Sequence, residues 1–242
     1  MLVPPPPHPG RAAGGQAEPA RRRYAEATLR MRRAQQARAE AEARRRAAES
    51  WRHEVHEYLR VWWAQAGERT AAAALRPPGR PGLTLFAADF LRVEEPAAIM
   101  SATLEAALAL SPARMGNIQL YDAAAGGLRI VTQYGFGRDF LDFFALVDDR
   151  RSACGVALAD ARTVQVHDVE RSELFGRGPA RDVVLAAGVR AVRSIPLVSD
   201  GVQLGVLSVH YHKPHDPDPV ERQLLATVAS AGMRRLSRSA GS

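Results

Sequence analysis

The chain has 242 residues, 46% of them hydrophobic, which is enough for one substantial domain and additional material. No apolar run approaches the roughly 20 residues that span a bilayer, and the Pro-rich start lacks the apolar stretch of a signal peptide, so we expect a cytoplasmic protein without membrane association. The net charge of +7 comes from residues 1–80, which hold 16 Arg and 8 Glu. Residues 81–242 hold 17 basic and 18 acidic residues and are nearly neutral. The high pI is therefore a property of the N-terminal part and says nothing about the C-terminal part.

The N-terminal part is predicted to contain a disordered tail and a long helix. Residues 1–17 are rich in Pro and Gly, a composition that is typical of disorder. Residues 18–75 are dominated by Arg, Ala and Glu, which favour a helix, and we expect a break near Gly67. Residues 76–93 begin with Arg76-Pro77-Pro78-Gly79 and are predicted to be a linker.

The second half of this helix carries a packing face that is typical of coiled coils. Trp51, Val55, Tyr58 and Trp62 recur at a spacing of about 3.5 residues. The face is expected to pair with a second helix, either of another copy or of a partner. Docking onto the chain's own domain and contact with nucleic acid are the alternatives, and the Glu residues interleaved with Arg argue against nucleic acid.

Residues 94–238 alternate between helical and strand patterns, which predicts one α+β domain. The expected elements, in chain order, are a helix at 95–110, strands at 116–122 and 128–134, helices at 139–147 and 154–159, a strand at 162–169, a helix at 179–187, strands at 191–199 and 203–212, and a helix from 219. This order predicts a central antiparallel sheet with the first and last helices on one face and the connecting segments on the other.

Local signals support several of these boundaries. Asp200-Gly201 predicts a tight hairpin between the last two strands. Gly188 is placed to end the preceding helix as a C′ glycine. Asp218, Pro219 and Glu221 form a capping-box pattern at the start of the last helix.

Four short patterns follow one another in an order and at a spacing that resemble those of the GAF domain family. They are Tyr121-Asp122 at the end of a strand, Gly155 followed by Val164 to Asp168, Ser194-Ile195-Pro196-Leu197, and Gly205-Val206-Leu207. The resemblance covers about 60% of the chain and implies a GAF/PAS-like sheet flanked by helices, preceded here by the long N-terminal helix. It also implies a bacterial sensory module of signal transduction, with a pocket on the sheet face opposite the terminal helices.

Strand alternation predicts which side chains face that pocket. Asn117 and Gln119 share one face of their strand, while Ile118 and Leu120 share the other and are expected to face the helices. A few polar groups below aromatic side chains are the usual composition of a small-molecule site. The expected ligand-binding residues are Asn117, Gln119, Tyr134, Phe136, Phe140, Phe144, Cys154, Asp168, Ser194, Ser208 and His210. The alternative is that these polar groups only satisfy loop backbone and that no ligand binds.

Cys154 is the only cysteine and the only candidate nucleophile. Its place near a predicted helix N-terminus is expected to lower the pKa of the thiol. Ser152-Ala153-Cys154-Gly155 also resembles a segment of free methionine-(R)-sulfoxide reductases, which are GAF-fold enzymes with a further reactive cysteine. Because the chain has no second cysteine, we expect no such activity and no catalytic site.

His210, His212 and His215 lie within six residues, and alternation along the strand predicts that His210 and His212 share one face. They match no established metal spacing, so we expect no metal site, and no cofactor is assigned. The expected function is a sensor that binds a small molecule and relays the signal through helix pairing, as a homodimer or with a partner such as a signalling kinase. A dimerisation or interaction module without a ligand is the main alternative, and a redox protein that uses Cys154 is another.

Overall fold

The computed structural model describes residues 17–74, 82–93 and 95–240, and by its contacts the chain divides into two units, Met1–Glu49 and Ser50–Ser242. The first helix, α1, spans Ala17–Ala74 and continues through Gly67, so the predicted break is wrong. Side-chain pairs three or four residues apart stabilise it locally, as between Arg22 and Glu26 and between Glu57 and Arg60. Residues 1–16 of the predicted tail and residues 76–81 of the predicted linker lie outside the described residues, as do the side chains of Trp51, Val55 and Trp62.

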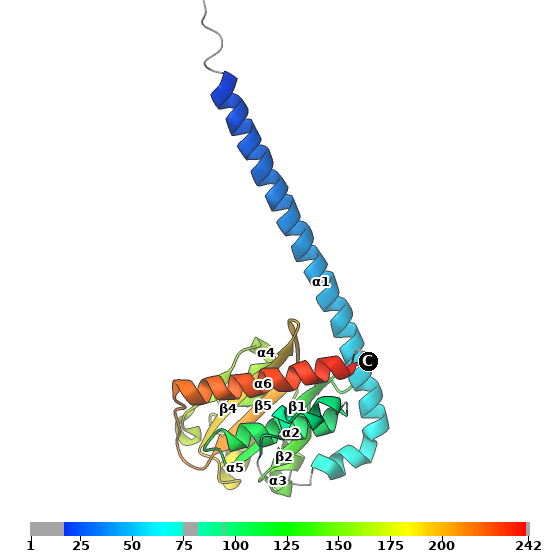
Figure 1. Cartoon of the computed structure of the whole chain (residues 1–242). Helices are drawn as coiled ribbons and strands as arrows, with labels where there is room; N and C mark the ends of the chain where they lie inside the picture. The colour runs from blue at the N-terminus through cyan, green and yellow to red at the C-terminus, as the bar shows by residue number, and fades with distance from the viewer. Residues whose placement is uncertain (1–16, 75–81, 94, 241–242) are drawn as a thin grey trace, which may run out of the picture. The chain divides into compact units, whose positions relative to one another are not determined.

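The second unit is built on a five-stranded sheet in which every pairing is antiparallel (Figure 1). The strands are β1 (Met115–Asp122), β2 (Gly127–Tyr134), β3 (Val164–Val166), β4 (Ala191–Ser199) and β5 (Val202–Tyr211), in the order β2-β1-β5-β4-β3. Asp200 and Gly201 both have positive φ, at 49° and 77°, which is the geometry of a tight two-residue hairpin. The predicted central antiparallel sheet and the hairpin are confirmed.

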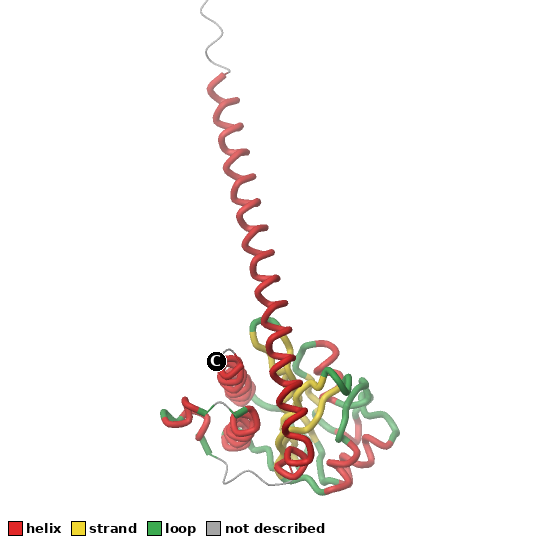
Figure 2. The backbone as a smooth tube through the Cα atoms, turned by 90° about the vertical axis from the view of Figure 1, so that its right-hand side faces the viewer, coloured by secondary structure: helices red, strands yellow, loops and turns green. Residues whose placement is uncertain are grey.

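Two helices cover one face of the sheet, α2 (Pro96–Ala109) and α6 (Pro219–Ala240). Figure 2 shows these two helices nearly end-on to one side of the strands and the connecting segments on the other side. Ile118, Leu120 and Leu207 from the sheet join Leu104 and Leu225 from the helices in one buried core. The apolar sides of the strands therefore face the helices, as alternation predicts.

The caps of these two helices follow from the local sequence. The Glu95 carboxylate accepts a hydrogen bond from the Ala98 backbone N–H at 2.6 Å. The Asp218 carboxylate accepts one from the Glu221 backbone N–H at 2.8 Å. The reciprocal half of the predicted capping box is not made, because the Glu221 carboxylate instead accepts from the Tyr211 hydroxyl at 2.7 Å and contacts the His215 ring at 2.8 Å.

The other face carries α3 (Arg138–Phe143), α4 (Ala153–Asp160), α5 (Pro179–Ala186) and the short 3-10 helix η3 (Val169–Arg171), while η1 (Thr84–Phe86) and η2 (Asp89–Arg92) precede α2. After α5, Gly188 has φ +79° and donates to the Leu185 carbonyl, while Val189 donates to the Val184 carbonyl, so the predicted C′ glycine forms a Schellman motif.

Two predicted elements on this face are shorter than expected. The helix predicted at 139–147 ends at Phe143, because the backbone of Val147 pairs with Leu128 as an extension of the sheet edge. The strand predicted at 162–169 ends at Val166. Two residues later, Asp168 caps the start of η3, and its carboxylate accepts a hydrogen bond from the Glu170 backbone N–H.

Candidate functional site

Four polar side chains are buried side by side on the sheet face opposite α2 and α6. Asn117 of β1 lies opposite Ser208 of β5, which in turn lies opposite Ser194 of β4, and His210 is two residues farther along β5. Together with aromatic and small side chains from the connecting segments, they surround a cavity of about 20 Å³. The described residues that line it are Asn117, Phe140, Phe144, Ser152, Ala153, Cys154, Phe175, Val184, Val192, Ser194, Ser208 and His210.

The predicted aromatic side chains pack around the His210 imidazole. The rings of Phe136 and Phe140 stack with their centroids 3.8 Å apart, and the Phe136 ring meets the His210 ring edge-on at 4.9 Å. Phe144 continues the row at 4.6 Å from Phe140. A row of rings beside one imidazole holds the orientation of that imidazole.

Several buried polar atoms have no hydrogen-bond partner within the described part of the chain. They include both ring nitrogens of His210, Oδ1 of Asn117, and both amide atoms of Gln119. His210 is 5% exposed and Asn117 3%. Each unsatisfied buried group costs about 1–3 kcal/mol, so this arrangement is unfavourable unless another molecule supplies the missing partners.

Burial also sets the protonation state of the imidazole. Removal of His210 from water lowers its pKa to about 3, because the charged form loses its hydration. At neutral pH the ring is therefore uncharged, with one nitrogen as a donor and the other as an acceptor.

We expect His210→Leu to raise the free energy of unfolding of the ligand-free protein by about 1–2 kcal/mol, because the leucine leaves no unpaired polar atom. Ser208→Ala is the matched contrast: the Ser194 and Ser208 hydroxyls bond each other at 2.8 Å. That substitution leaves the Ser194 hydroxyl without its partner and should lower stability by about 1–2 kcal/mol. Urea unfolding followed by circular dichroism measures both changes, and a loss of stability in His210→Leu would contradict the interpretation.

Cys154 lines the same cavity near the start of α4, but its environment differs from the prediction. Burial raises the pKa of the thiol, and the nearby Ser152 hydroxyl, 3.2 Å from Sγ, only partly offsets this. The predicted lowering by the helix N-terminus is therefore wrong. A protonated thiol is a weak nucleophile at neutral pH.

Four predicted site residues do not line this cavity, and one of them, Phe136, still packs against the His210 ring. Gln119 is fully buried on the same strand but does not line the cavity. Tyr134 packs against the core under α2 and α6, because it pairs with Gly116, at which a Cβ atom would point toward Leu104 of α2. Asp168 caps η3 and forms an ion pair with Arg171 at 3.6 Å. Neither Tyr134 nor Asp168 lines the cavity, and their predicted role in ligand binding stays a prediction.

An open cleft of about 670 Å³ lies above the buried cavity, and sequence reasoning missed it. It is formed by two segments far apart in the chain, residues 143–152 and 173–180. Phe144, Ser152 and Phe175 line both the cleft and the buried cavity, so the two spaces are neighbours. The only sequence signals were two apolar pairs, Phe143-Phe144 in the helix predicted at 139–147 and Leu174-Phe175 between the predicted elements.

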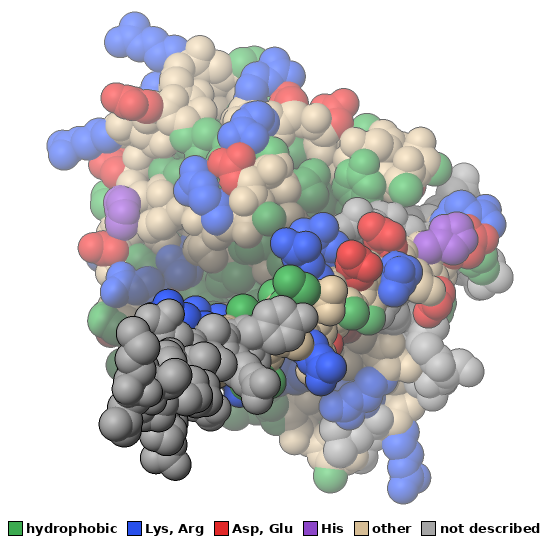
Figure 3. Space-filling view, turned by 90° about the horizontal axis from the view of Figure 1, so that it is seen from above, with side chains coloured by type: hydrophobic (Ala, Val, Ile, Leu, Met, Phe, Trp, Pro, Cys, Tyr) green, Lys and Arg blue, Asp and Glu red, His purple; other side chains and the backbone are tan. Residues whose placement is uncertain are grey.

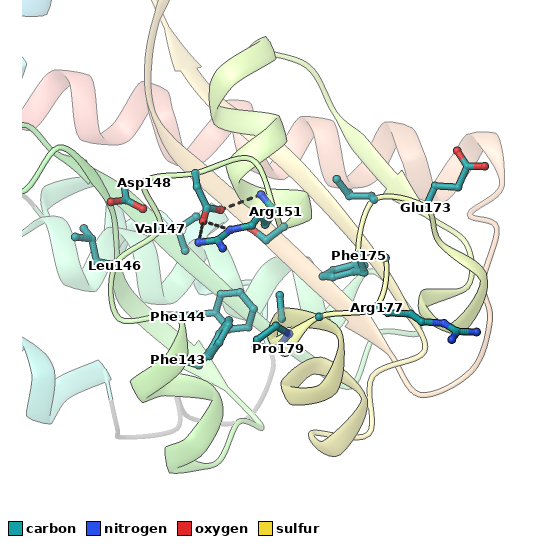
Figure 4. A pocket seen from close by; sticks show the side chains of 16 residues that line it. Phe143, Phe144, Leu146, Val147, Asp148, Arg151, Glu173, Phe175, Arg177 and Pro179 are labelled. Atoms are coloured by element: carbon teal, nitrogen blue, oxygen red, sulfur yellow. Dashed lines mark hydrogen bonds and ion pairs between the residues drawn. The ribbon is translucent and has the colours of Figure 1, made fainter.

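Figure 4 shows how the cleft is lined. The side chains of Phe143, Phe144 and Pro179 gather at one side, and the Phe175 ring lies across from them. Arg151 reaches toward the cleft and is bonded to Asp149, with Nε 2.6 Å from Oδ2. Glu173 and Arg177 point away from the cleft at its far rim.

The three neighbouring histidines are separated in the structure. His210 is buried, whereas His212 is exposed with Nδ1 2.9 Å from the Gly188 carbonyl oxygen, and His215 pairs with Glu221. β5 ends at Tyr211, so His212 lies just beyond the strand that carries His210. Among the described residues no group of three metal-ligating side chains occurs, and none of the described helices is long and apolar enough to cross a membrane.

Comparison with solved structures finds the same fold in bacterial proteins. A domain assigned to a two-component sensor histidine kinase of Sinorhizobium meliloti is 22% identical, with 58% of this chain and 90% of that chain covered and a TM-score of 0.50. The GAF domain/HD domain protein of Geobacter sulfurreducens is 15% identical, with 60% and 94% covered and a TM-score of 0.51. A free methionine-R-sulfoxide reductase of Neisseria meningitidis in complex with its substrate is 19% identical, with 66% and 97% covered and a TM-score of 0.46.

A search of curated protein sequences found no match. The model of one protein family, described as GAF domain, matches residues 93–233, which is more than half of the chain and includes the sheet, α2 and most of α6. The chain therefore belongs to the GAF domain family.

Proposed function

We propose that this protein is a sensory module that binds a small molecule in a site formed by the open cleft and the buried polar cavity together. GAF domains are commonly sensory or regulatory modules of signalling proteins. The main support for this proposal is that His210 lines the cavity and is buried with neither ring nitrogen hydrogen-bonded. A ligand that supplied these partners would bind the folded state only and so stabilise it.

The proposed signal passes to α1. A helix of 58 residues, with Leu29 and Met31 exposed, offers a long surface for pairing with the same helix of a second copy or with a partner such as a signalling kinase in the cytoplasm. A ligand shifts such pairing only if it binds two states of the domain with different affinity. On the face seen in Figure 3 the basic side chains are interspersed with acidic ones, which favours a protein partner over nucleic acid.

The proposed role is not catalytic. Cys154 has a raised pKa, and the sequence contains no second cysteine with which it would form a disulfide within one chain. If the protein were instead a sulfoxide reductase, Cys154→Ser would abolish reduction of free methionine sulfoxide. We expect no such activity in the native protein in the presence of dithiothreitol.

Native mass spectrometry of the gently purified full-length protein tests the proposal. We expect a species heavier than 26.3 kDa per chain that loses the additional mass on denaturation. His210→Leu should lose the additional mass, whereas His53→Leu, which changes an exposed histidine of α1, should retain it. A bare chain in the native protein and in both variants would favour the interaction module without a ligand.

A further inference from the structure

The buried cavity offers no charged group to a ligand. Of the described residues that line it, none is Asp, Glu, Lys or Arg. Its two titratable residues are both uncharged at neutral pH, since burial lowers the pKa of His210 and raises that of Cys154. An ionised ligand group placed there would lose its hydration without gaining an opposite charge, which is strongly unfavourable.

The cleft above it does not supply the missing charge. Its lining contains three acidic residues and two basic ones, Asp148, Asp149, Glu173, Arg151 and Arg177. Arg151 is held by Asp149, which accepts hydrogen bonds from both its side chain and its backbone N–H. Arg177 points away at the exposed rim, where an ion pair contributes little.

The shape and polarity of the walls suit a flat apolar body. Phe143, Phe144 and Pro179 lie on one side and Phe175 on the other, and Phe143 is 42% exposed although it is a large apolar side chain. Aromatic side chains pack favourably against planar rings. Phe144 and Phe175 also line the buried cavity, so the two rings lie between the cleft and His210.

The unpartnered atoms define the polar end of the ligand. Oδ1 of Asn117 is an acceptor and needs a donor. The uncharged His210 ring presents one donor and one acceptor, so it needs both an acceptor and a donor. A primary amide or a lactam carries these groups close together without any charge.

We infer that the ligand is an uncharged planar molecule with an apolar body between Phe144 and Phe175 and an amide-like end bonded to His210 and Asn117. The inference rests on the proposed function and adds the chemical class of the ligand. It distinguishes this site from one that selects an acid, a phosphate ester or an amine.

The probes 2-naphthamide and 2-naphthoate share the same planar apolar body and differ in the charge of the polar end, which is uncharged in the amide and negative in the carboxylate. Isothermal titration calorimetry with the full-length protein at pH 7 should detect binding of the amide and on the order of tenfold or more weaker binding of the carboxylate. His210→Leu should weaken amide binding by about tenfold or more, because it removes two hydrogen bonds. His53→Leu should leave it unchanged.

Three outcomes would overturn the inference. Carboxylate binding as tight as amide binding would show that the site accepts an anion, while the proposed ligand site would stand. Amide binding that His210→Leu does not affect would show that the polar end lies elsewhere. If neither probe bound, the chemical class would be wrong, and the mass retained by the native protein would decide separately whether a ligand site exists.

Discussion

Gly205→Ala is expected to lower the free energy of unfolding by about 3 kcal/mol or more. Gly205 lies within β5, where that strand approaches β1 so closely that a Cβ atom would be 2.1 Å from the backbone oxygen of Gln119 and 3.0 Å from Cα of Leu120. Because both are backbone atoms of the neighbouring strand, rotation of a side chain cannot relieve the overlap. The two strands would have to separate in the middle of the sheet, which also displaces the polar residues of the site.

Gly137→Ala is the matched control. A Cβ atom at Gly137 would meet nothing within 4 Å, and its φ of −83° is allowed for alanine. This substitution should lower stability by less than about 1 kcal/mol, the cost of placing Ala instead of Gly at the N-cap of α3. Urea unfolding of both variants provides the comparison, and equal stability of Gly205→Ala and the native protein would show that the strands separate at little cost.

The stability of the ligand-free protein is expected to fall by about 2 kcal/mol between pH 8 and pH 5 because of His210. Its pKa is about 3 in the folded protein, against an ordinary value of 6.5. Below pH 6.5 the unfolded chain binds a proton at this position and the folded chain does not, so acid favours unfolding. The contribution is fully present above pH 6.5 and is lost progressively as the pH falls toward 3.

Urea unfolding at pH 8, 7, 6 and 5 measures this dependence, and the difference between the native protein and His210→Leu isolates it from the other titrating groups. The variant should lose about 2 kcal/mol less over this range. If both proteins had the same pH dependence, His210 would titrate normally, and the buried, uncharged imidazole on which the proposed site depends would not exist in solution.

The predictions that hold from sequence are those that depend on neighbouring residues. Alternation along β1 and β5 correctly divides Asn117, Ser208 and His210 from Ile118 and Leu207, because successive side chains of a strand point to opposite faces. The hairpin at Asp200-Gly201 and the cap at Asp218 also follow from local backbone preferences. These features, with the order of the elements, identify the α+β sheet and the side of it that carries the polar cavity.

The tertiary structure decided three features that depend on residues from different segments: the direction of Tyr134, the pKa of Cys154 and the cleft. Tyr134 turns toward the helices because the pairing of β1 with β2 shifts at Ile118 and Gln119, which alternation along one strand cannot reveal. The Cys154 pKa rises because the thiol is removed from water in the fold, where it lines the cavity with residues of β1, β4 and β5. The cleft joins residues 143–152 to residues 173–180. Sequence patterns report local geometry, whereas burial, charge and cavities arise from contacts between distant segments, and only the folded chain brings those segments together.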